Sequence, residues 1–300
     1  MVKKILFSLL FLSLLAACSS QPAAEQKELP TYRIGYMICN SEQETLDRFI
    51  PMSAYLGEQL GVRFETVPID TIRFTREIEN LDFVHTNSLL YIILNRFNGV
   101  EVLAAEKKGA LGHKSQGIIL ALKKSGLQSI KDLKGKSMIF GPMLAPTGFM
   151  AQLDLLQQND LDIEDDLANY TIPGGSFKHE KVIYGVLFER YDAGSIPLDD
   201  LEIMVADNRI DADNFIILAK SNPIPYCNFA VPQKTDENLA RKFKKAVLAL
   251  EKKDTVAMNG EVVRVLRRAK IDGYVDVNDA DFDIVREMAK RTNMPPYQKF

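Results

Sequence analysis

Short β-rich segments alternate with amphipathic helices along nearly the whole of this 300-residue sequence. The β-rich segments are residues 32–39, 62–67, 81–85, 100–105, 117–122, 137–140, 191–195, 201–205 and 215–219. The segments with helical periodicity are residues 45–60, 71–80, 87–97, 148–158, 178–190, 237–252, 260–269 and 279–291. Because strands that alternate with helices usually pair in parallel, the sequence predicts an α/β fold with mostly parallel sheets.

Length and composition limit the kind of protein further. Three hundred residues suffice for about two domains of ordinary size. Apolar residues make up 46% and charged residues 26%, which is typical of a folded globular chain and excludes a disordered one. The formal net charge is −3, whereas nucleic-acid binding needs a clustered excess of cations. The sequence therefore predicts no nucleic-acid partner.

The N-terminus has the pattern of a bacterial signal peptide. Two lysines precede an apolar run over residues 5–15, which is too short to remain as a membrane-spanning helix. Leu15-Ala16-Ala17-Cys18 resembles the lipobox, after whose cleavage Cys18 becomes a lipidated N-terminus. The alternative is an ordinary signal peptide that happens to contain a cysteine. We expect residues 1–17 to be removed and Cys18 to carry the lipid.

The segment that follows is expected to be a tether. Residues 18–30 are mostly polar, contain Pro22 and show no periodicity, which predicts a flexible linker. Several acyl chains on one cysteine anchor a protein stably, whereas one chain gives only marginal membrane binding. We therefore expect a protein of the bacterial cell envelope, held on a membrane and facing the periplasm or the exterior.

Motifs for catalysis, cofactors and metals are missing from the sequence. It has no G-x-G-x-x-G, no P-loop and no G-x-S-x-G nucleophile elbow. Its histidines, His85, His113 and His179, have no His or Cys neighbour at metal-ligand spacing. We expect a binding protein without cofactor or metal, and not an enzyme.

Two cysteines remain in the predicted mature chain besides Cys18. Cys39 and Cys227 could form a disulfide in an oxidising compartment. They could equally be two small buried thiols, and the sequence leaves both interpretations open.

Polar residues mark four junctions where a predicted strand leads into a predicted helix. Ligands of α/β proteins bind outside strand ends, at helix N-termini and in clefts between domains. A helix N-terminus favours an anion, although helix capping explains Ser, Thr and Asn there as well. Lys178 lies at one such start, where a cation is unfavourable unless an anion is nearby. The four junctions are residues 39–41, 86–88, 145–148 and 176–179.

Seven short segments stand in an order and at spacings that are found together in one protein family. The two most specific are residues 179–183 (HEKVI) and 191–196 (YDAGSI). The others are residues 33–35, 51–62, 81–83, 129–136 and 222–225. With these segments the sequence resembles, over nearly its whole predicted mature length, the phosphate/phosphite/phosphonate substrate-binding lipoproteins of bacterial ABC importers (PhnD-like proteins).

The resemblance implies a type II periplasmic-binding-protein fold, with two α/β domains and a ligand cleft between them. Domain 1 would be discontinuous, with residues 31–112 and 223–300, and residues 113–222 would form an inserted domain 2. Two hinge strands would cross between the domains near residues 110–116 and 221–225. Closure about this hinge would trap the ligand.

The resemblance also implies where an oxyanion would bind. The hydroxyl-rich helix start that binds the oxyanion in the family falls at residues 145–148, and the family's histidine falls at His179. Its tyrosine positions fall near Thr71 and Thr86, next to the polar junction at 86–88.

Departures from the family pattern bear on the ligand. Two hydroxyl groups are missing from residues 145–148, and Pro146 removes an N–H donor there. The acidic pair that holds the amine of an aminoalkylphosphonate falls near Asp199 and Cys227, and a thiol does not neutralise an ammonium group. Nearby tyrosines such as Tyr226 could restore hydroxyl groups. The expected ligand-binding residues are Thr71, Thr86, Asn87, Ser88, Ala145, Thr147, Gly148, His179, Asp199, Tyr226 and Cys227.

Together these observations predict a lipid-anchored, monomeric substrate-binding protein of an ABC importer. It would capture a small oxyanion of the phosphonate, phosphite or phosphate kind between its domains and deliver it to a permease. The alternative is a sensory or partner-docking lipoprotein of the same fold with a different small ligand. Neighbouring permease and ATPase genes would favour the importer, and an adjacent sensor kinase would favour the alternative.

Overall fold

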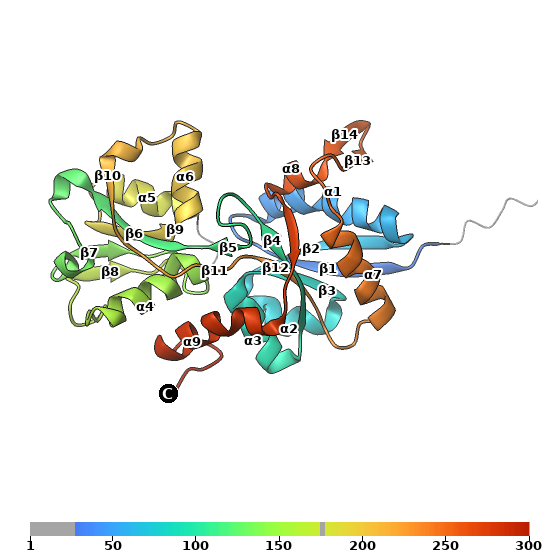
Figure 1. Ribbon diagram of the computed structural model, residues 1–300, viewed down its shortest axis with the longest axis horizontal. Helices are drawn as coiled ribbons and strands as arrows, with labels where there is room; N and C mark the ends of the chain where they lie inside the picture. The colour runs from blue at the N-terminus through green and yellow to red at the C-terminus, as the bar shows by residue number, and fades with distance from the viewer. Residues whose placement is uncertain (1–27, 175–177, 300) are drawn as a thin grey trace, which may run out of the picture.

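The computed structural model describes residues 28–174 and 178–299. The predicted signal peptide, Cys18, residues 19–27 of the predicted tether and Ser176 of one predicted helix start lie outside the described residues. Two separate sheets with helices packed around them form the body of the protein (Figure 1). Within the described part of the chain, every helix is too short or too polar to cross a membrane.

The larger sheet is built from strands near both ends of the chain. These strands are β1 (Thr31–Met37), β2 (Arg63–Ile69), β3 (Phe83–Thr86), β4 (Glu101–Lys107), β12 (Asn228–Val231) and β15 (Gly273–Asp276). Their order across the sheet is β15-β4-β12-β3-β1-β2. β1 is parallel to β2 and β3, whereas β12 is antiparallel to β3 and β4, and β15 is antiparallel to β4. We call this sheet and the helices packed on it lobe 1.

The second sheet is built from the middle of the chain and forms, with its helices, lobe 2. Its strands are β6 (Gly117–Leu122), β7 (Ser137–Ile139), β8 (Asn169–Thr171), β9 (Ala193–Pro197) and β10 (Phe215–Lys220). Their order is β10-β6-β9-β7-β8, with β7 parallel to β8 and β9, and β6 antiparallel to β9 and β10. The prediction of mostly parallel sheets is therefore wrong. After each crossing between the lobes, the chain first forms a strand that is antiparallel to both of its neighbours. This strand is β6 in lobe 2 and β12 in lobe 1.

Two short strands lie side by side where the chain passes between the lobes. β5 (Lys114–Ser115) pairs antiparallel with β11 (Ile224–Pro225) (Figure 1). These strands lie within the two segments predicted for the hinge. The domain boundaries proposed after residues 112 and 222 stay a prediction.

The helices begin and end largely where sequence signals place them. α1 begins after Ser41, whose hydroxyl accepts a hydrogen bond from the Glu44 N–H at 3.2 Å, and it ends at Gly61, which has φ 64°. The helices on lobe 1 are α1 (Glu42–Leu60), α2 (Phe74–Glu77), α3 (Ser88–Asn98), α7 (Glu237–Leu248) and α8 (Val265–Ala269). Those on lobe 2 are α4 (Ala151–Gln158), α5 (His179–Leu187) and α6 (Leu198–Ala206).

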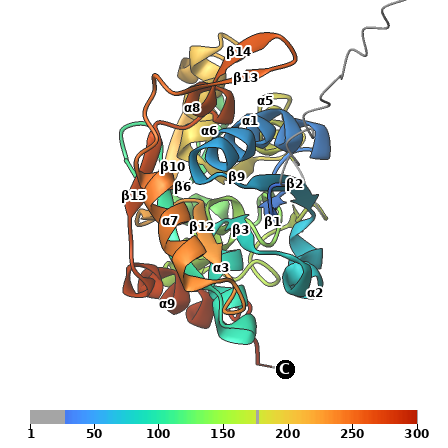
Figure 2. The same ribbon diagram turned by 90° about the vertical axis from the view of Figure 1, so that its right-hand side faces the viewer.

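Alternate residues of β3 face two different hydrophobic cores of lobe 1. Phe83 stacks on Phe243 of α7, with ring centroids 3.9 Å apart, in the core that α1 also covers. Val84 points to the other face and packs in the core that α3 covers. α1 and α3 therefore lie on opposite faces of the sheet (Figure 2).

The C-terminal helix, α9 (Asp283–Arg291), contacts both lobes. It packs against α3 of lobe 1 and α4 of lobe 2 (Figure 1). Arg291 donates two hydrogen bonds to the carboxylate of Asp154 in α4, from Nε at 2.6 Å and from Nη2 at 2.9 Å. Asp154 is buried, so the pair fixes the end of α9 to lobe 2.

One predicted strand, and the first half of one predicted helix, have the opposite secondary structure. Residues 201–205 belong to α6 and not to a strand, because Asp199 and Asp200 supply the acidic first turn that favours a helix start. Residues 260–264 belong to a hairpin of β13 (Thr255–Met258) and β14 (Glu261–Arg264), and residues 265–269 form the short α8. Asn259-Gly260 forms its turn, with φ of 51° and 80°.

The remaining differences concern short or interrupted elements. Residues 71–80, predicted as one helix, form two 3₁₀ turns with α2 between them. Residues 148–158 begin in a turn of π-helix over Pro146–Met150 before α4. The sequence reasoning missed β8, β12 and β15, each of three or four residues, because strands this short carry little periodicity.

Candidate functional site

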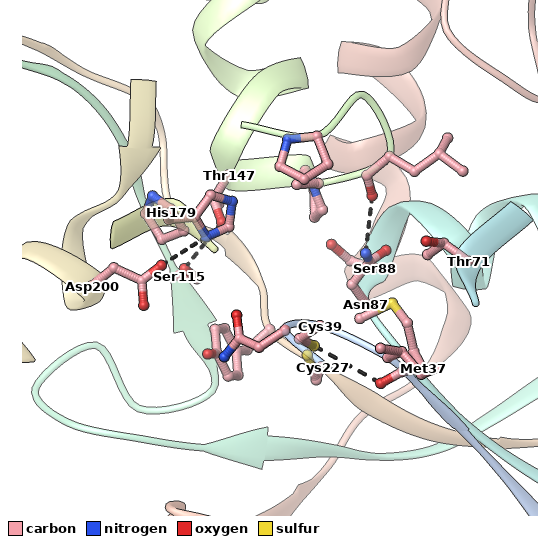
Figure 3. Close-up of a pocket in the computed structure, with 18 of the residues that line it drawn as sticks. Met37, Cys39, Thr71, Asn87, Ser88, Ser115, Thr147, His179, Asp200 and Cys227 are labelled. Atoms are coloured by element: carbon pink, nitrogen blue, oxygen red, sulfur yellow. Dashed lines mark hydrogen bonds and ion pairs between the residues drawn. The ribbon is translucent and has the colours of Figure 1, made fainter. Parts of the chain in front are cut away.

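A cavity of about 240 Å³ lies between the two lobes and is lined by both (Figure 3). Lobe 1 contributes the chain just after β1, the first turns of α1 and α3 and the residue that follows β4. Lobe 2 contributes residues 142–147 and the starts of α5 and α6, and the hinge strands contribute Ser115 and Pro225. Because small ligands bind in clefts between domains, this cavity is the candidate ligand site.

Most of the residues predicted from the sequence meet in this cavity. They come from both lobes and from the segment that follows the second hinge strand. The structure thus brings together positions that are up to 156 residues apart in the sequence, and their role in binding a ligand stays a prediction. The predicted residues that line the cavity are Thr71, Asn87, Ser88, Ala145, Thr147, His179, Tyr226 and Cys227.

Three predicted residues do not line the cavity. Thr86 is fully buried, and its Oγ1 has no hydrogen-bond partner in the described part of the chain. Gly148 lies against the imidazole of His179, so that a Cβ at residue 148 would be 2.4 Å from Nε2. Asp199 is screened from the cavity by two lining residues whose side chains contact its Oδ2.

Three buried hydroxyl-bearing side chains line the cavity from lobe 1, the hinge and lobe 2: Ser88, Ser115 and Thr147 (Figure 3). Ser88 opens α3, and its Oγ has no hydrogen-bond partner among the described residues. Ser115 donates to Thr147 through a long contact of 3.4 Å between the hydroxyl oxygens. Hydroxyl groups next to a helix N-terminus suit an oxyanion, because they donate hydrogen bonds where the helix dipole is positive.

The predicted oxyanion-binding turn offers fewer backbone donors than expected. The N–H groups of residues 148–150 all point to the carbonyl oxygen of Ala145, at 3.2, 2.9 and 3.4 Å. These three N–H groups are therefore bonded within the turn and not free to bind a ligand. The Thr147 side chain is the hydroxyl that this turn supplies to the cavity.

Asp200 holds the imidazole of His179. Nδ1 of His179, the first residue of α5, lies 2.8 Å from Oδ2 of Asp200 in α6. Burial alone would raise the pKa of Asp200, but the hydrogen bond and charge of His179 and the charge of Lys108 lower this pKa below its usual value. The carboxylate is therefore charged at neutral pH and fixes the ring orientation.

The cavity also holds charged side chains that sequence reasoning missed. Arg48 in α1 donates from Nε and Nη2 to the carbonyl oxygen of Ala269, at 3.1 and 2.9 Å. Lys108, just after β4, donates from Nζ to Asp199 Oδ2 at 2.8 Å. Asp200 lies in the first turn of α6, directly after β9, and so belongs to a further strand-to-helix junction. The wrong prediction of a strand over residues 201–205 concealed this junction. The charged lining residues not predicted are Glu44, Arg48, Lys108, Glu180, Asp200 and Lys270.

Cys39 and Cys227 are both free thiols, and they lie near each other at the cavity (Figure 3). Cys39 is exposed by area, so it is not one of two buried thiols. Desolvation in the cavity nevertheless raises the pKa of Cys39 to about 11 and raises that of Cys227 well above its usual value. Both are neutral at physiological pH. Among the described residues no three His, Cys, Asp or Glu side chains group as a metal site would require.

A buried hydrogen-bonded pair lies in the core of lobe 1 near the cavity. His85 Nε2 is 2.9 Å from Glu106 Oε1, and both side chains are almost inaccessible to solvent. Burial raises the pKa of Glu106, but the charge and hydrogen bond of His85 and the charge of Arg48 bring this pKa below its usual value. Glu106 is therefore a buried carboxylate that the protein keeps charged.

Known proteins match this chain in sequence and in structure. The family described as ABC transporter, phosphonate, periplasmic substrate-binding protein matches residues 34–282. Among solved structures, PhnD1 from Prochlorococcus marinus (MIT 9301) in complex with methylphosphonate superimposes with a TM-score of 0.72 at 19% identity. The match covers 88% of this chain and 98% of that chain.

Two further structures support the same fold. The binding protein component of an ABC phosphonate transporter from Pseudomonas aeruginosa has a TM-score of 0.71 at 14% identity, over 89% of this chain and 87% of that chain. A Xanthomonas citri protein bound to a chloride ion has a TM-score of 0.71 at 15% identity, over 88% of this chain and 97% of that chain. The predicted two-domain α/β fold of periplasmic binding proteins is therefore confirmed.

The sequence match extends over most of the chain and includes both sheets and the two hinge strands. Proteins of this family are substrate-binding components of transporters in the cell envelope, and they are generally not enzymes. This chain belongs to the periplasmic phosphonate substrate-binding protein family of ABC transporters.

Proposed function

We propose that the protein binds a small oxyanion of the phosphonate, phosphite or phosphate kind in the cavity between its lobes and delivers it to an ABC permease. In this proposal a lipid on Cys18 anchors the protein to the membrane, residues 18–30 are the tether, and the protein acts as a monomer. The proposed domains are residues 31–112 with 223–300, and residues 113–222.

The observation that carries the proposal is the hydroxyl group of Ser88. Its Oγ is fully buried at the start of an 11-residue helix, lines the cavity and has no partner in the described protein. A buried polar group without a partner costs about 1–3 kcal/mol. An oxyanion in the cavity would remove this cost by accepting a hydrogen bond from Ser88, with the helix dipole adding to the attraction.

Groups on lobe 2, on the hinge and in α1 of lobe 1 complete the proposed site. Thr147 and Ser115 would direct their hydroxyls to the same anion, because their mutual contact of 3.4 Å is long for a hydrogen bond between hydroxyls. Arg48 would add positive charge, since its guanidinium bonds to a backbone carbonyl and not, within the described residues, to a carboxylate. The anion would thus join the lobes, as closure of a two-domain binding protein requires.

Calorimetric titration of phosphate, phosphite and methylphosphonate into the wild type, Ser88→Ala and Thr147→Val tests this proposal. Loss of one hydrogen bond to a charged ligand, about 1.5–3 kcal/mol, should weaken binding by roughly 10- to 150-fold. Thr75→Val, on an exposed position of α2, is the matched control and should bind as the wild type does. Binding of none of the three anions by the wild type would overturn the proposed ligand class.

Delivery to a permease needs a separate test. Deletion of the gene should abolish growth on the bound anion as sole phosphorus source. A gene with Cys18→Ser, which removes the lipid-bearing thiol, should restore growth poorly compared with the wild-type gene. Normal growth of the deletion strain on that anion, in the absence of other phosphorus, would contradict a transport role.

A further inference from the structure

Each carboxylate around the cavity already has a basic side chain of the protein as its partner. Lys270 approaches Glu44 to 3.1 Å, and His179 approaches Asp200 to 2.8 Å. Asp199, just outside the cavity, has Lys108 at 2.8 Å. The remaining lining carboxylate also has a cation, since Arg209 lies 2.9 Å from Glu180.

Lys108 stands between the cavity and Asp199. Its Nζ donates to Asp199 Oδ2 at 2.8 Å and lies 3.4 Å from the hydroxyl of Tyr226. The same ammonium group lies 5.5 Å from the centroid of the Tyr226 ring, as in a cation–π contact. Lys108 and Tyr226 line the cavity and Asp199 does not, so the two side chains screen the carboxylate from a ligand.

Lys108 keeps its charge in this position. Burial lowers its pKa, but the nearby carboxylates of Asp199 and Asp200 outweigh burial, and the pKa lies above its usual value. A ligand ammonium group at this end of the cavity would meet a fixed cation and no unpaired carboxylate. Burying a charge without a partner is strongly unfavourable, so such a ligand would bind poorly.

The other groups at this end of the cavity do not supply a negative charge for a ligand ammonium group. The thiols of Cys39 and Cys227 are uncharged, because desolvation in the cavity raises the pKa of both. Arg48 is a second cation here: it donates to the backbone carbonyl of Ala269, and in the described residues it has no carboxylate within ion-pair distance. The cavity therefore offers a ligand substituent cations, thiols and a phenol, but no free anion.

We infer that Lys108 determines ligand specificity: its ammonium group pairs with Asp199, the carboxylate that would otherwise accept the ammonium group of a ligand. The cavity thus selects phosphonates whose substituent is uncharged or anionic and rejects aminoalkylphosphonates. This inference rests on the proposed function and names the substrate class of the same site.

The test compares methylphosphonate with 2-aminoethylphosphonate by calorimetry at pH 7 in the wild type, Lys108→Met and Asp199→Asn. The wild type should bind methylphosphonate at least about tenfold more tightly than the amine. Lys108→Met keeps the length of the side chain and frees the Asp199 carboxylate, so the ratio of the two affinities should shift toward the amine by about tenfold or more. Asp199→Asn removes the carboxylate and leaves Lys108 unpaired, so the ratio should shift the other way.

Lys107→Met is the matched control, because Lys107 is exposed, adjacent in sequence and absent from the cavity lining. It should leave the ratio unchanged. If the wild type binds both ligands equally, or if both Lys108→Met and Asp199→Asn leave the ratio unchanged, the inference is wrong while the proposed function stands. If the wild type binds no phosphonate, phosphite or phosphate, the proposed function is wrong and the inference falls with it.

Discussion

His179 and Asp200 form a hydrogen bond of 2.8 Å across the starts of two helices of lobe 2, between Nδ1 and Oδ2. The other ring nitrogen, Nε2, is buried without a hydrogen-bond partner in the described structure and faces Gly141 and Gly148. The carboxylate and the two glycines thus fix the ring from opposite sides. Substitutions at Asp200 and at Gly148 therefore test whether anion binding depends on the position of this ring.

Replacement of Asp200 should show whether this residue positions His179 or only adds negative charge to the cavity. If Asp200 only added negative charge, Asp200→Asn would strengthen binding of an anion. If it positions His179, Asp200→Asn should weaken methylphosphonate binding by about tenfold, roughly 1.4 kcal/mol. Calorimetry decides between these outcomes, and Asp165→Asn, at an exposed position outside the cavity, is the charge-matched control.

The side chain of an alanine at position 148 has no room beside the imidazole. Its Cβ would lie 2.4 Å from Nε2 of His179 and 3.1 Å from the Cβ of Ala145. Gly148→Ala should therefore displace the ring, lower the free energy of unfolding by about 1–3 kcal/mol and weaken anion binding. Gly174→Ala is the control, because a Cβ there meets no atom of the described residues within 4 Å. Equal stability and affinity of Gly148→Ala and the wild type would contradict the packing described.

The contact of α9 with lobe 2 should contribute to stability. Arg291→Met would leave the buried carboxylate of Asp154 without its bidentate partner. Arg291 is itself half-exposed, so water can replace part of the interaction, and we expect a loss of about 1–3 kcal/mol in urea unfolding. Lys290→Met removes an exposed pair with Glu287 and a cation–π contact with Tyr297, and should change stability by less than about 1 kcal/mol. Equal effects of the two substitutions would refute the proposed role of Arg291.

The buried Glu106 should make stability depend on pH in the acid range. Its pKa is lower in the folded protein than the usual 4.5, so it stabilises the fold fully above pH 4.5. That contribution is lost as pH falls through the folded pKa. Glu106→Gln should lower the free energy of unfolding at pH 7 by about 3 kcal/mol or more, because the partner His85 stays buried. The difference from the wild type should shrink below pH 4.5, and a constant difference from pH 7 to pH 3 would contradict this account.

Elements with clear local signals in the sequence were predicted close to their observed bounds. The helical periodicity of residues 45–60 placed α1 to within three residues, and the continuous apolar run of β6 was predicted with its observed bounds. Two predictions were wrong where signals in the sequence favoured different secondary structures. Residues 201–205 were predicted as a strand although an acidic helix start precedes them, and residues 260–264 as part of an amphipathic helix although Asn259-Gly260 signals a hairpin.

The site was predictable only where its residues stand at strand-to-helix junctions or match a family motif. Ser88, Thr147 and His179 satisfy one or both conditions. Lys108 and Arg48 do not, because nothing local distinguishes them from other surface cations. Their role depends on Asp199 and Ala269, which are 91 and 221 residues away in the sequence and come close only in the folded protein.

A crystal structure of the complex with methylphosphonate tests the central claim most directly. The proposed site predicts density for the phosphonate between the lobes, with its oxygen atoms at about 2.5–3.2 Å from the hydroxyl oxygens of Ser88 and Thr147. Ser88, whose Oγ has no partner in the described unliganded protein, should then have one. Phosphonate bound outside this cavity, or within it but out of reach of both hydroxyls, would contradict the account.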